Sequence, residues 1–278
     1  MMIRIIVFCL LSIVTASCGQ SSKAIKIMSF NVRYGTADDG ENSWEKRKDA
    51  AAEMILDQKP ALFGVQEALD FQIEDILERC PAYKCVGVGR EDGLLSGEHL
   101  SVFYDTGRLV LKDWGTYWLS ETPDVPSKGW DAKCKRTATW LLLYDTKAGE
   151  SFYIVNTHLD HKGVEARVMG LGLITGRIGL MNTENRPMIL MGDLNVHPGN
   201  PSLDVLRPIM HDAWTNAKKT NPGPTWHDFG KKNEGTPIDY IFYSGFNKCE
   251  CMLRIQKSYG GVPFVSDHYP VMAVLRYR

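Results

Sequence analysis

Residues 187–198, PMILMGDLNVHP, constrain the fold of this chain more than any other segment. The apolar run 188–191 predicts a short buried strand, and Gly192 allows the backbone to turn directly after it. Asp193 and Asn195 follow at the carboxyl end of that strand, where α/β proteins commonly build their sites. Because side chains two residues apart on an extended backbone point the same way, both can address one atom. The alternative interpretation is a Gly-Asp turn that Asn195 caps.

The composition indicates an ordinary globular protein with a substantial core. Of its 278 residues, 44% are hydrophobic and 23% are charged, which suits one domain of roughly 250 residues. The formal net charge is -1, so no basic excess is available to neutralise a phosphate backbone. Nucleic acid therefore stays open as a partner but is not indicated by the charge. We expect a monomer.

The N-terminus has the layout of a secretory signal. Arg4 precedes the apolar run 5–14, and small residues follow at positions 16 and 17. This run is too short to span a membrane comfortably. We expect residues 1–17 to be a signal peptide that takes no part in the fold.

Cys18 follows this signal directly. The sequence Thr-Ala-Ser-Cys resembles a bacterial lipobox, although Thr15 departs from the usual Leu or Val. We expect Cys18 to be the lipidated first mature residue, residues 18–24 to be a tether, and residues 25–278 to be the folded domain. The protein is then an exported lipoprotein, in the periplasm, at the outer membrane or on the cell surface, and the lipid is its only membrane contact. The alternative is a soluble signal followed by an incidental cysteine.

Five further cysteines give the exported part an odd number of thiols. They are Cys80, Cys85, Cys134, Cys249 and Cys251. At most two disulfides can form, and at least one thiol is left over. Cys249 and Cys251 flank one residue of an expected strand, where they point the same way but are poorly placed to bond each other. Zinc is not indicated, because no CxxC pair occurs with matching histidines.

The apolar periodicity predicts strands interleaved with helices. Strands are expected at 25–34, 61–65, 83–88, 100–104, 109–119, 137–144, 151–157, 188–191, 238–243, 251–256 and 270–276, and helices at 44–58, 71–79, 164–181 and 202–206. The close spacing of the strands within 83–119 suggests a meander, which excludes a purely parallel sheet. Two packed sheets with helices outside fit this order. Polar loops are expected at 120–136 and 221–232.

Polar residues gather where these expected strands begin or end. They are Asn31, Glu67, His158, Asp193, Asn195, Asp239, Asp267 and His268. One such residue carries no weight, because a cap or a turn explains it. Acids, amides and histidines at six separate strand edges together indicate a site.

The chemistry that needs this mixture is metal-assisted attack of water on a phosphate ester. Glu67, Asp267 and the amide oxygen of Asn31 are hard oxygen ligands, which suit Mg²⁺ or Mn²⁺. Histidine titrates near neutral pH, and a carboxylate partner fixes its tautomer and raises its pKa. Asp239 is a candidate for that partner to His268.

The motifs FNVR, QE, NTHLDH, GDLN, IDYIF and SDHYPV occur in an order and spacing that resemble the endonuclease/exonuclease/phosphatase superfamily. The resemblance covers nearly all of the chain after the signal. It implies a four-layer α/β sandwich, DNase-like, with two mainly antiparallel sheets and the site at one end of them. It also implies that Glu67 binds the metal, with Asn31 and Asp267 close to metal or phosphate.

The same resemblance implies catalytic roles. Asp193 would orient or deprotonate the attacking water with help from Asn195. His268, paired with Asp239, would act as a general base or stabilise the transition state, and His158 would contact the phosphate or assist the leaving group. The base role stays open between Asp193 and His268.

Three more residues are candidates for binding the substrate. Arg136 suits a bidentate phosphate contact, and Trp130 could stack on a substrate ring, although a lone Trp is more often a packing residue. His227 is the third. Each of them also has a purely structural explanation.

The expected function is a Mg²⁺- or Mn²⁺-dependent phosphoesterase that acts outside the cytoplasm. Abasic-site repair is disfavoured, because the superfamily's abasic endonucleases carry Asn-x-Asp in the first motif and lack the NTHLDH histidine, whereas this chain has Arg33 and His158. A secreted nuclease is the alternative within the same class. A surface lipoprotein that binds without catalysis is the alternative from another class.

Overall fold

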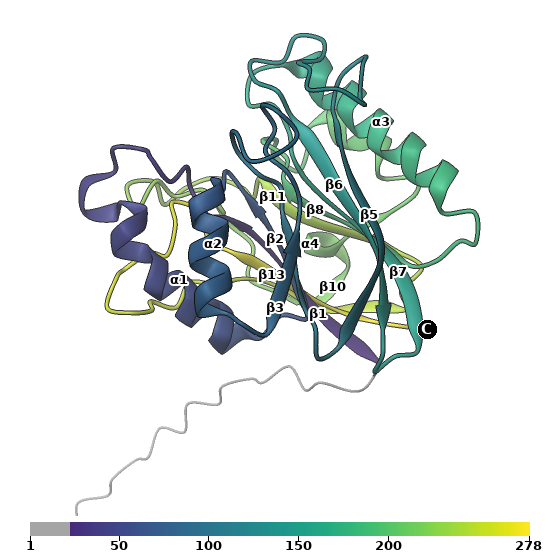
Figure 1. Ribbon diagram of the computed structural model, residues 1–278. Coiled ribbons are helices and arrows are strands. Elements are labelled where there is room, and N and C mark those ends of the chain that lie inside the picture. The colour runs from purple at the N-terminus through teal and green to yellow at the C-terminus, as the bar shows by residue number, and fades with distance from the viewer. Residues whose placement is uncertain (1–22) are drawn as a thin grey trace, which may run out of the picture.

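The computed structural model describes residues 23–278, which form two packed sheets with helices outside them (Figure 1). The strands are β1 (Ala24–Asn31), β2 (Leu62–Gln66), β3 (Tyr83–Val86), β4 (Val102–Asp105), β5 (Leu109–Trp118), β6 (Thr137–Asp145), β7 (Glu150–His158), β8 (Met188–Asp193), β9 (His211–Asp212), β10 (Ala217–Thr220), β11 (Asp239–Ser244), β12 (Lys248–Arg254) and β13 (Val271–Arg276). The helices are α1 (Trp44–Gln58), α2 (Asp70–Arg79), α3 (Val164–Met181) and α4 (Ala213–Asn216), with 3-10 turns η1 (Gly40–Asn42) and η2 (Pro201–Val205). The expected signal peptide and Cys18 lie outside the described residues.

The two sheets are mixed but mainly antiparallel. One sheet has seven strands in the order β10-β12-β13-β1-β2-β4-β3, and the other has six in the order β5-β6-β7-β8-β11-β9. The pairs β1–β2, β7–β8 and β10–β12 are parallel, and the other pairs are antiparallel. Helices α1 and α2 cover the outside of the first sheet and α3 that of the second (Figure 1). The expected four-layer α/β sandwich is confirmed.

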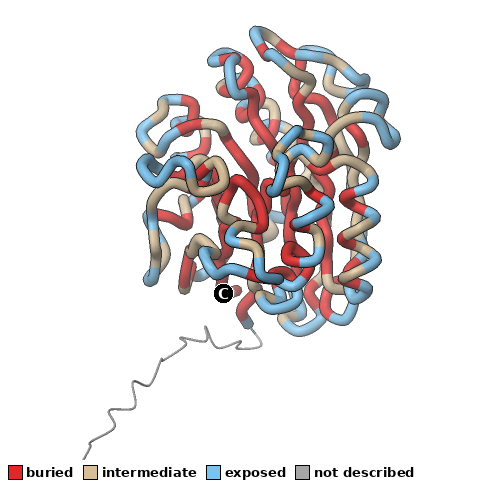
Figure 2. The backbone as a smooth tube through the Cα atoms, turned by 90° about the vertical axis from the view of Figure 1, so that its left-hand side faces the viewer, coloured by how far each residue is buried: buried red, intermediate tan, exposed pale blue. Residues whose placement is uncertain are grey.

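Both faces of the central strands are buried, which explains their nearly continuous apolar sequences. Ile25 and Ile27 of β1 pack in the cluster that fills the space between the sheets. Met28 and Phe30 point the other way and pack against α1 and α2. The alternation continues to Asn31, whose side chain therefore turns into the space between the sheets at the end of the strand. Figure 2 shows buried residues gathered in the interior of the molecule and exposed residues around its outside.

A polar layer ties the two sheets together just below the strand ends. Gln66 Nε2 donates to Asn156 Oδ1 at 2.7 Å and to Ser29 Oγ at 3.1 Å, and Asn156 Nδ2 donates to the Val65 carbonyl at 2.8 Å. Gly64 makes this approach feasible, because a Cβ there would lie 2.6 Å from Asn156 Cγ. The buried hydrogen bonds fix the spacing of the sheets beneath the edge where the polar residues gather.

The expected meander was wrong at its third strand. β3 and β4 pair with each other, but β5 belongs to the other sheet. Arg108 anchors the crossing with a buried ion pair, its Nε and Nη2 donating to Asp145 at 2.9 and 2.6 Å. Nη2 also donates to the carbonyl of Ala24 at 2.7 Å. The short turn before β5 therefore changes sheets and does not close a hairpin.

The described cysteines form no disulfide with one another. A bulge between Cys249 and Cys251 also overturns the expectation that these two side chains point the same way. Cys249 packs in the core between the sheets, whereas Cys251 packs with Ala24 and Val274. Within residues 23–278, no helix has both the length and the apolar character needed to cross a membrane.

Candidate active site

Polar side chains from both sheets meet in a pocket of about 370 Å³ at one end of the sandwich. It is lined by Arg33, Glu67, Arg136, His158, His161, Asp193, Asn195, Trp226, Ile238, Asp267 and His268. Strands β1, β2, β7 and β8 all end here, and β11 begins here because Asp239 pairs with Asp193. The pocket therefore collects residues at or just after the ends of four strands and residues that precede β6, β11 and β13.

Asp193 lies at the centre of this group. Its Oδ2 accepts a hydrogen bond from Asn31 Nδ2 at 3.2 Å and lies 3.4 Å from His158 Nε2 and 3.8 Å from His268 Nε2. Its Oδ1 accepts from the backbone N–H of Asn195 at 2.9 Å. Two histidine rings and an amide thus surround one carboxylate oxygen, which is the arrangement needed to transfer a proton.

Gly192 has a different function from the expected turn. β8 continues through it to Asp193, and a Cβ at Gly192 would lie 1.8 Å from the Thr157 carbonyl oxygen. The backbone turns only at Asn195, whose φ is 53°. Glycine is required because the neighbouring strand passes so close, and the turn residue is an Asn, which tolerates this conformation.

Burial and a neighbouring carboxylate make Asp193 easier to protonate. Burial raises its pKa to about 7, and the negative charge of Asp239 contributes in the same direction. The charge of His268 opposes this rise. A carboxyl group with a pKa near neutrality can accept a proton and later release it, as a general base requires.

Asp239 and His268 form a buried pair behind Asp193. Asp239 Oδ2 lies 2.9 Å from His268 Nδ1. Burial alone would lower the pKa of His268, but the charge and hydrogen bond of Asp239 and the charges of Asp193 and Asp267 raise it well above its usual value. His268 is therefore an imidazolium at neutral pH, with Nε2 directed toward Asp193.

His158 has the opposite charge state. Its pKa is well below the usual value, because the ring is buried and Arg136 adds a positive charge nearby. Asn195 Nδ2 lies 2.9 Å from His158 Nε2 and 3.0 Å from the Leu159 carbonyl. With Asn195 as the donor, Nε2 is the acceptor and the proton of the neutral ring is on Nδ1. The pocket thus pairs a neutral histidine with a charged one.

Glu67 is held at the pocket edge by a left-handed backbone, with φ of 62°. Its Oε1 accepts from Asn31 Nδ2 at 2.9 Å, and its Oε2 accepts from the backbone N–H of Tyr34 at 3.0 Å. The Asn31 amide oxygen accepts from the Arg33 N–H at 3.0 Å. An amide oxygen has a second lone pair, so the expectation that the Asn31 oxygen lies close to a metal stays a prediction. In this structure Asn31 orients Glu67 and Asp193.

The donor set suits a hard divalent cation. One ligand atom each from Glu67, His158 and Asp193 lie within 4.8 Å of one another, and the same holds for Asp193, Asp239 and His268. Burial raises the pKa of Asp193, and the negative charge of Asp239 adds to the rise. A bound cation would relieve that charge, which is the physical reason to expect one. The acidic and histidine groups needed to hold a metal ion are therefore present.

Asp267 lies at the rim on the Glu67 side. Its Oδ1 accepts from Ser266 Oγ at 3.3 Å, and its Oδ2 lies 3.6 Å from Arg33 Nη1. Burial raises the pKa of Asp267, while Arg33 and His268 oppose the rise. Arg33 is itself fixed by two hydrogen bonds of 2.9 Å to Asp39. The Asp267 carboxylate is thus available to bind a cation, or to contact a group that the positive charge of Arg33 attracts into the pocket.

The Arg47 side chain connects the segment that follows Asn31 to the segment that precedes Asp267. Its buried guanidinium donates to the carbonyls of Val32, Val265 and Asn42. We expect Arg47→Met to lower the free energy of unfolding by about 3 kcal/mol, since three buried carbonyls lose their donor. The midpoint of thermal unfolding, measured by circular dichroism, should fall by about 6–12 °C.

The matched control for that prediction is Arg207→Met, because the Arg207 side chain is half exposed at the surface, two residues after η2. It should change the unfolding midpoint by no more than about 2 °C. Equal midpoints for the two variants would contradict the role given to Arg47.

The three expected substrate-binding residues have different positions. Arg136 lines the pocket, with Nη2 3.3 Å from His161 Nδ1. His227 does not line it, because its ring packs between Tyr269 and Phe264 at centroid distances of 4.0 and 4.6 Å. Trp130 is also outside the lining of this pocket.

Trp226 is one of the lining residues that sequence reasoning missed. It is adjacent to His227, which the sequence analysis predicted to bind the substrate in the loop at 221–232. The prediction therefore missed the lining residue by one position. On an extended segment, neighbours point to opposite sides. His227 points into the protein and Trp226 into the pocket, which only the pairing of this loop could decide.

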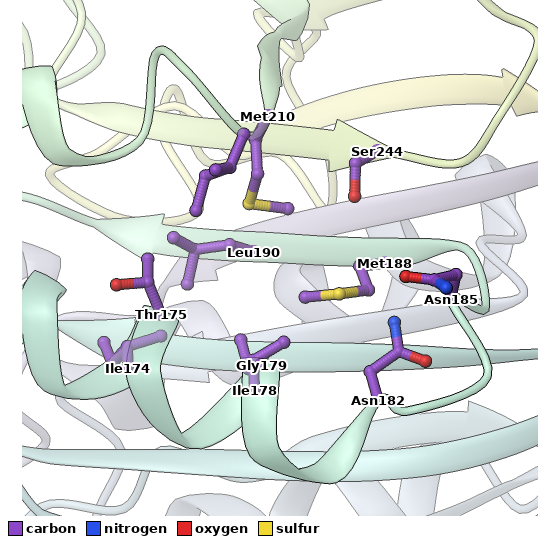
Figure 3. Close-up of a pocket in the computed structure, with 11 residues that line it drawn as sticks. Ile174, Thr175, Ile178, Gly179, Asn182, Asn185, Met188, Leu190, Met210 and Ser244 are labelled. Carbon is purple, nitrogen blue, oxygen red and sulfur yellow. The ribbon is translucent and has the colours of Figure 1, made fainter.

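A second pocket, of about 310 Å³, lies between α3 and the beginning of β8 (Figure 3). Ile174, Ile178, Leu190 and Met188 give it an apolar wall. The residues that line it include no acid, base or thiol. It lies at the opposite end of β8 from Asp193 and therefore contributes nothing to the polar site.

A two-sheet α/β sandwich with a buried acid and two histidines at one end is suited to the hydrolysis of phosphate esters. The family model described as the Endonuclease/Exonuclease/phosphatase family matches residues 28–268. The chain belongs to this family.

Solved structures support the same assignment. A mannosyl-6-phosphatase from Bacteroides thetaiotaomicron is 32% identical, with a TM-score of 0.87 over 91% of this chain and 100% of that chain. A family protein from Bacteroides vulgatus is 34% identical, with a TM-score of 0.86 over 92% of this chain and 99% of that chain. An uncharacterised protein of the Acanthamoeba polyphaga mimivirus is 26% identical over 273 residues, 90% of this chain and 99% of that protein.

Proposed function

We propose that this protein is a metal-dependent phosphatase that hydrolyses phosphate monoesters of small polar alcohols, such as sugars, outside the cytoplasm. The observation that carries the proposal is the position of Asp193, whose carboxylate lies within 3.8 Å of both a neutral and a charged histidine in one pocket. A base, a fixed cation and a set of oxygen ligands are then available to one phosphate group.

Glu67 is the residue that would hold Mg²⁺ or Mn²⁺, with Asp193 and Asp267 close by. When bound, the cation supplies charge that polarises a phosphoryl oxygen. Asn31 keeps Glu67 and Asp193 in place through its two amide hydrogen bonds. The oxygen-rich composition of this set favours a hard ion over a soft one.

The remaining residues carry the hydrolysis. Asp193 takes a proton from water as the water oxygen bonds to phosphorus and the ester P–O bond breaks. The leaving alkoxide takes a proton from solvent water, and Asp193 later releases its own proton to solvent, so ester and water yield the alcohol and inorganic phosphate. His268, held as an imidazolium by Asp239, stabilises the negative charge that develops on the phosphoryl oxygens. We therefore assign the base role to Asp193 and the electrostatic role to His268.

Three observations favour a small monoester over nucleic acid. The formal net charge is -1, which provides no excess of cations for a polyanion. The pocket volume, about 370 Å³, is at the lower end for ligand sites. One relative of 32% identity is a mannosyl-6-phosphatase. The nuclease and the non-catalytic lipoprotein are the competing functions.

A substrate panel tests the proposal. Residues 23–278 are incubated with Mg²⁺ or Mn²⁺ and hexose 6-phosphates, glycerol 3-phosphate, bis-p-nitrophenyl phosphate, a phospholipid, or single- and double-stranded DNA. We expect release of inorganic phosphate from the monoesters, abolished by EDTA. Cleavage of DNA alone would establish the nuclease instead. No turnover of any substrate with either metal would favour the binding lipoprotein.

Export and lipidation are the second part of the proposal. They rest on the signal-like sequence and on Cys18. Labelled palmitate fed to bacterial cells expressing the full chain should enter the protein, and Cys18→Ser should prevent this. Label in the variant would exclude Cys18 as the lipid attachment site, and the absence of label in both would indicate a soluble signal.

Glu67→Gln tests the assignment of the metal ligand. The amide keeps the shape but loses the charge, so we expect the affinity for Mn²⁺, measured by calorimetry, to fall about 100-fold. Glu45→Gln is the control, because that side chain is exposed in α1. Unchanged Mn²⁺ affinity in Glu67→Gln would remove Glu67 from the set of ligands.

A further inference from the structure

Trp226 forms a wall of the active-site pocket that the hydrolysis described above does not use. Its side chain lines the pocket together with Ile238 and His268. It is 37% exposed, so a large aromatic ring stays open to solvent beside convergent polar groups. Such a surface is typical of a wall that binds part of a ligand.

Backbone hydrogen bonds hold Trp226 in a fixed position. The His227 N–H donates to the Asp267 carbonyl at 2.9 Å, and the Tyr269 N–H donates to the Thr225 carbonyl at 2.7 Å. Thr225 is 0% and His227 1% exposed. The two neighbours of Trp226 are thus anchored inside the protein, and the extended backbone leaves the Trp ring on the pocket side.

Thr225 also connects this wall to the start of β11. Its Oγ1 accepts hydrogen bonds from the N–H groups of Ile238 at 3.0 Å and Asp239 at 3.2 Å. Trp226 is therefore joined through its neighbours to both segments that supply the Asp239–His268 pair. The ring has a set position relative to the groups that act on the phosphate.

Lys232 contacts one face of the Trp226 ring. Its Nζ lies 3.9 Å from the ring centroid, a cation–π contact. The aliphatic Ile238 lies at the same wall of the pocket. An aromatic face beside an aliphatic side chain favours a ring with an apolar face, and offers little to a short acyclic polyol.

Resting on the proposed phosphatase activity, we infer that Trp226 and Ile238 bind the ring of the leaving alcohol and thereby select phosphate monoesters of ring-bearing alcohols. A pyranose and a nucleoside both present such a ring. Trp226 is thus a determinant of specificity and takes no part in the proton transfers.

The test compares three monoesters: hexose 6-phosphate, nucleoside 5′-monophosphate and glycerol 3-phosphate. In Trp226→Ala, we expect the ratio of kcat/KM for the preferred ring substrate to that for glycerol 3-phosphate to fall at least about 10-fold, mainly through KM. Trp226→Phe should retain most of the ratio, because a ring is still present. The ring substrate with the larger loss identifies the sugar or the base as the group that binds.

Trp114→Ala is the matched control, because Trp114 of β5 is 38% exposed and does not line the pocket. It should leave the ratio unchanged. Equal losses of kcat/KM on all three substrates in Trp226→Ala would show that Trp226 has only a structural role. Unchanged kcat/KM on all three would show that Trp226 does not contribute to binding. Either result overturns the inference.

A binding measurement separates this inference from the proposed function. Saturation-transfer NMR with hexose 6-phosphate is recorded on Asp193→Asn protein, which needs no turnover. The ring protons should receive saturation, and the signal should be lost when Trp226→Ala is added. If the wild-type protein hydrolyses no monoester, the proposed phosphatase fails. A signal that depends on Trp226 would still support ring binding, and a signal that persists in the double variant would overturn it.

Discussion

Asp193→Asn is expected to lower kcat on the best monoester by about 10³- to 10⁴-fold, with little change in KM. The amide keeps the shape of the carboxylate and its hydrogen bond from the Asn195 N–H, but it cannot accept a proton from water. Steady-state kinetics with saturating Mg²⁺ measure this loss. Asp124→Asn, an exposed position on the expected loop, is the control and should retain full activity. A loss smaller than 10-fold would exclude Asp193 as the base.

The same variant should be more stable than the wild-type protein when metal is removed. Burial and Asp239 raise the pKa of Asp193 to about 7, so its ionised form is disfavoured in the folded state. The destabilisation is absent below the unfolded pKa near 4 and is complete above the folded pKa near 7. Asp193→Asn should therefore raise the unfolding midpoint in EDTA by several degrees at pH 8 and by less at pH 5. Equal differences at both pH values would contradict this account.

His268→Gln is expected to lower kcat by about 10²- to 10³-fold, because a fixed positive charge beside the phosphate is lost. The pH profile provides a second readout. Asp193 must be ionised, so activity rises with pH through its pKa, which a bound cation shifts downward. His268 must be protonated, so activity falls as pH rises through its raised pKa. His268→Gln should remove the fall at alkaline pH.

Asp239→Asn separates the charge of His268 from its position. The amide can still contact His268 Nδ1, now at 2.9 Å from Asp239 Oδ2, but it no longer stabilises the imidazolium. The alkaline fall in activity should move to lower pH, with a smaller loss of kcat at pH 6 than at pH 8. A uniform loss with an unshifted pH profile would mean that Asp239 only supports the local fold.

The strands that carry the site could be predicted from the sequence, because each is a short apolar run that ends in a polar residue. Asn31, His158 and Asp193 follow such runs, and all three lie in the same pocket or border it. The assignment of β5 to the first sheet was wrong for a physical reason. The turn after β4 changes sheets because Arg108 pairs with Asp145, 37 positions away, and local periodicity carries no information about that contact.

The sequence by itself determined the residue types, their places along each strand and the alternation of side chains along unbroken strands such as β1, since these depend on local periodicity and on where a strand ends. It also determined the family, through six motifs in order. Only the tertiary structure decided which strand ends meet, as for Asn31 and Asp193, 162 positions apart. It also decided that His268 is charged while His158 is neutral, and that Trp226 faces the pocket while His227 does not. Those properties depend on burial and on neighbours brought from other parts of the chain, which no local pattern records.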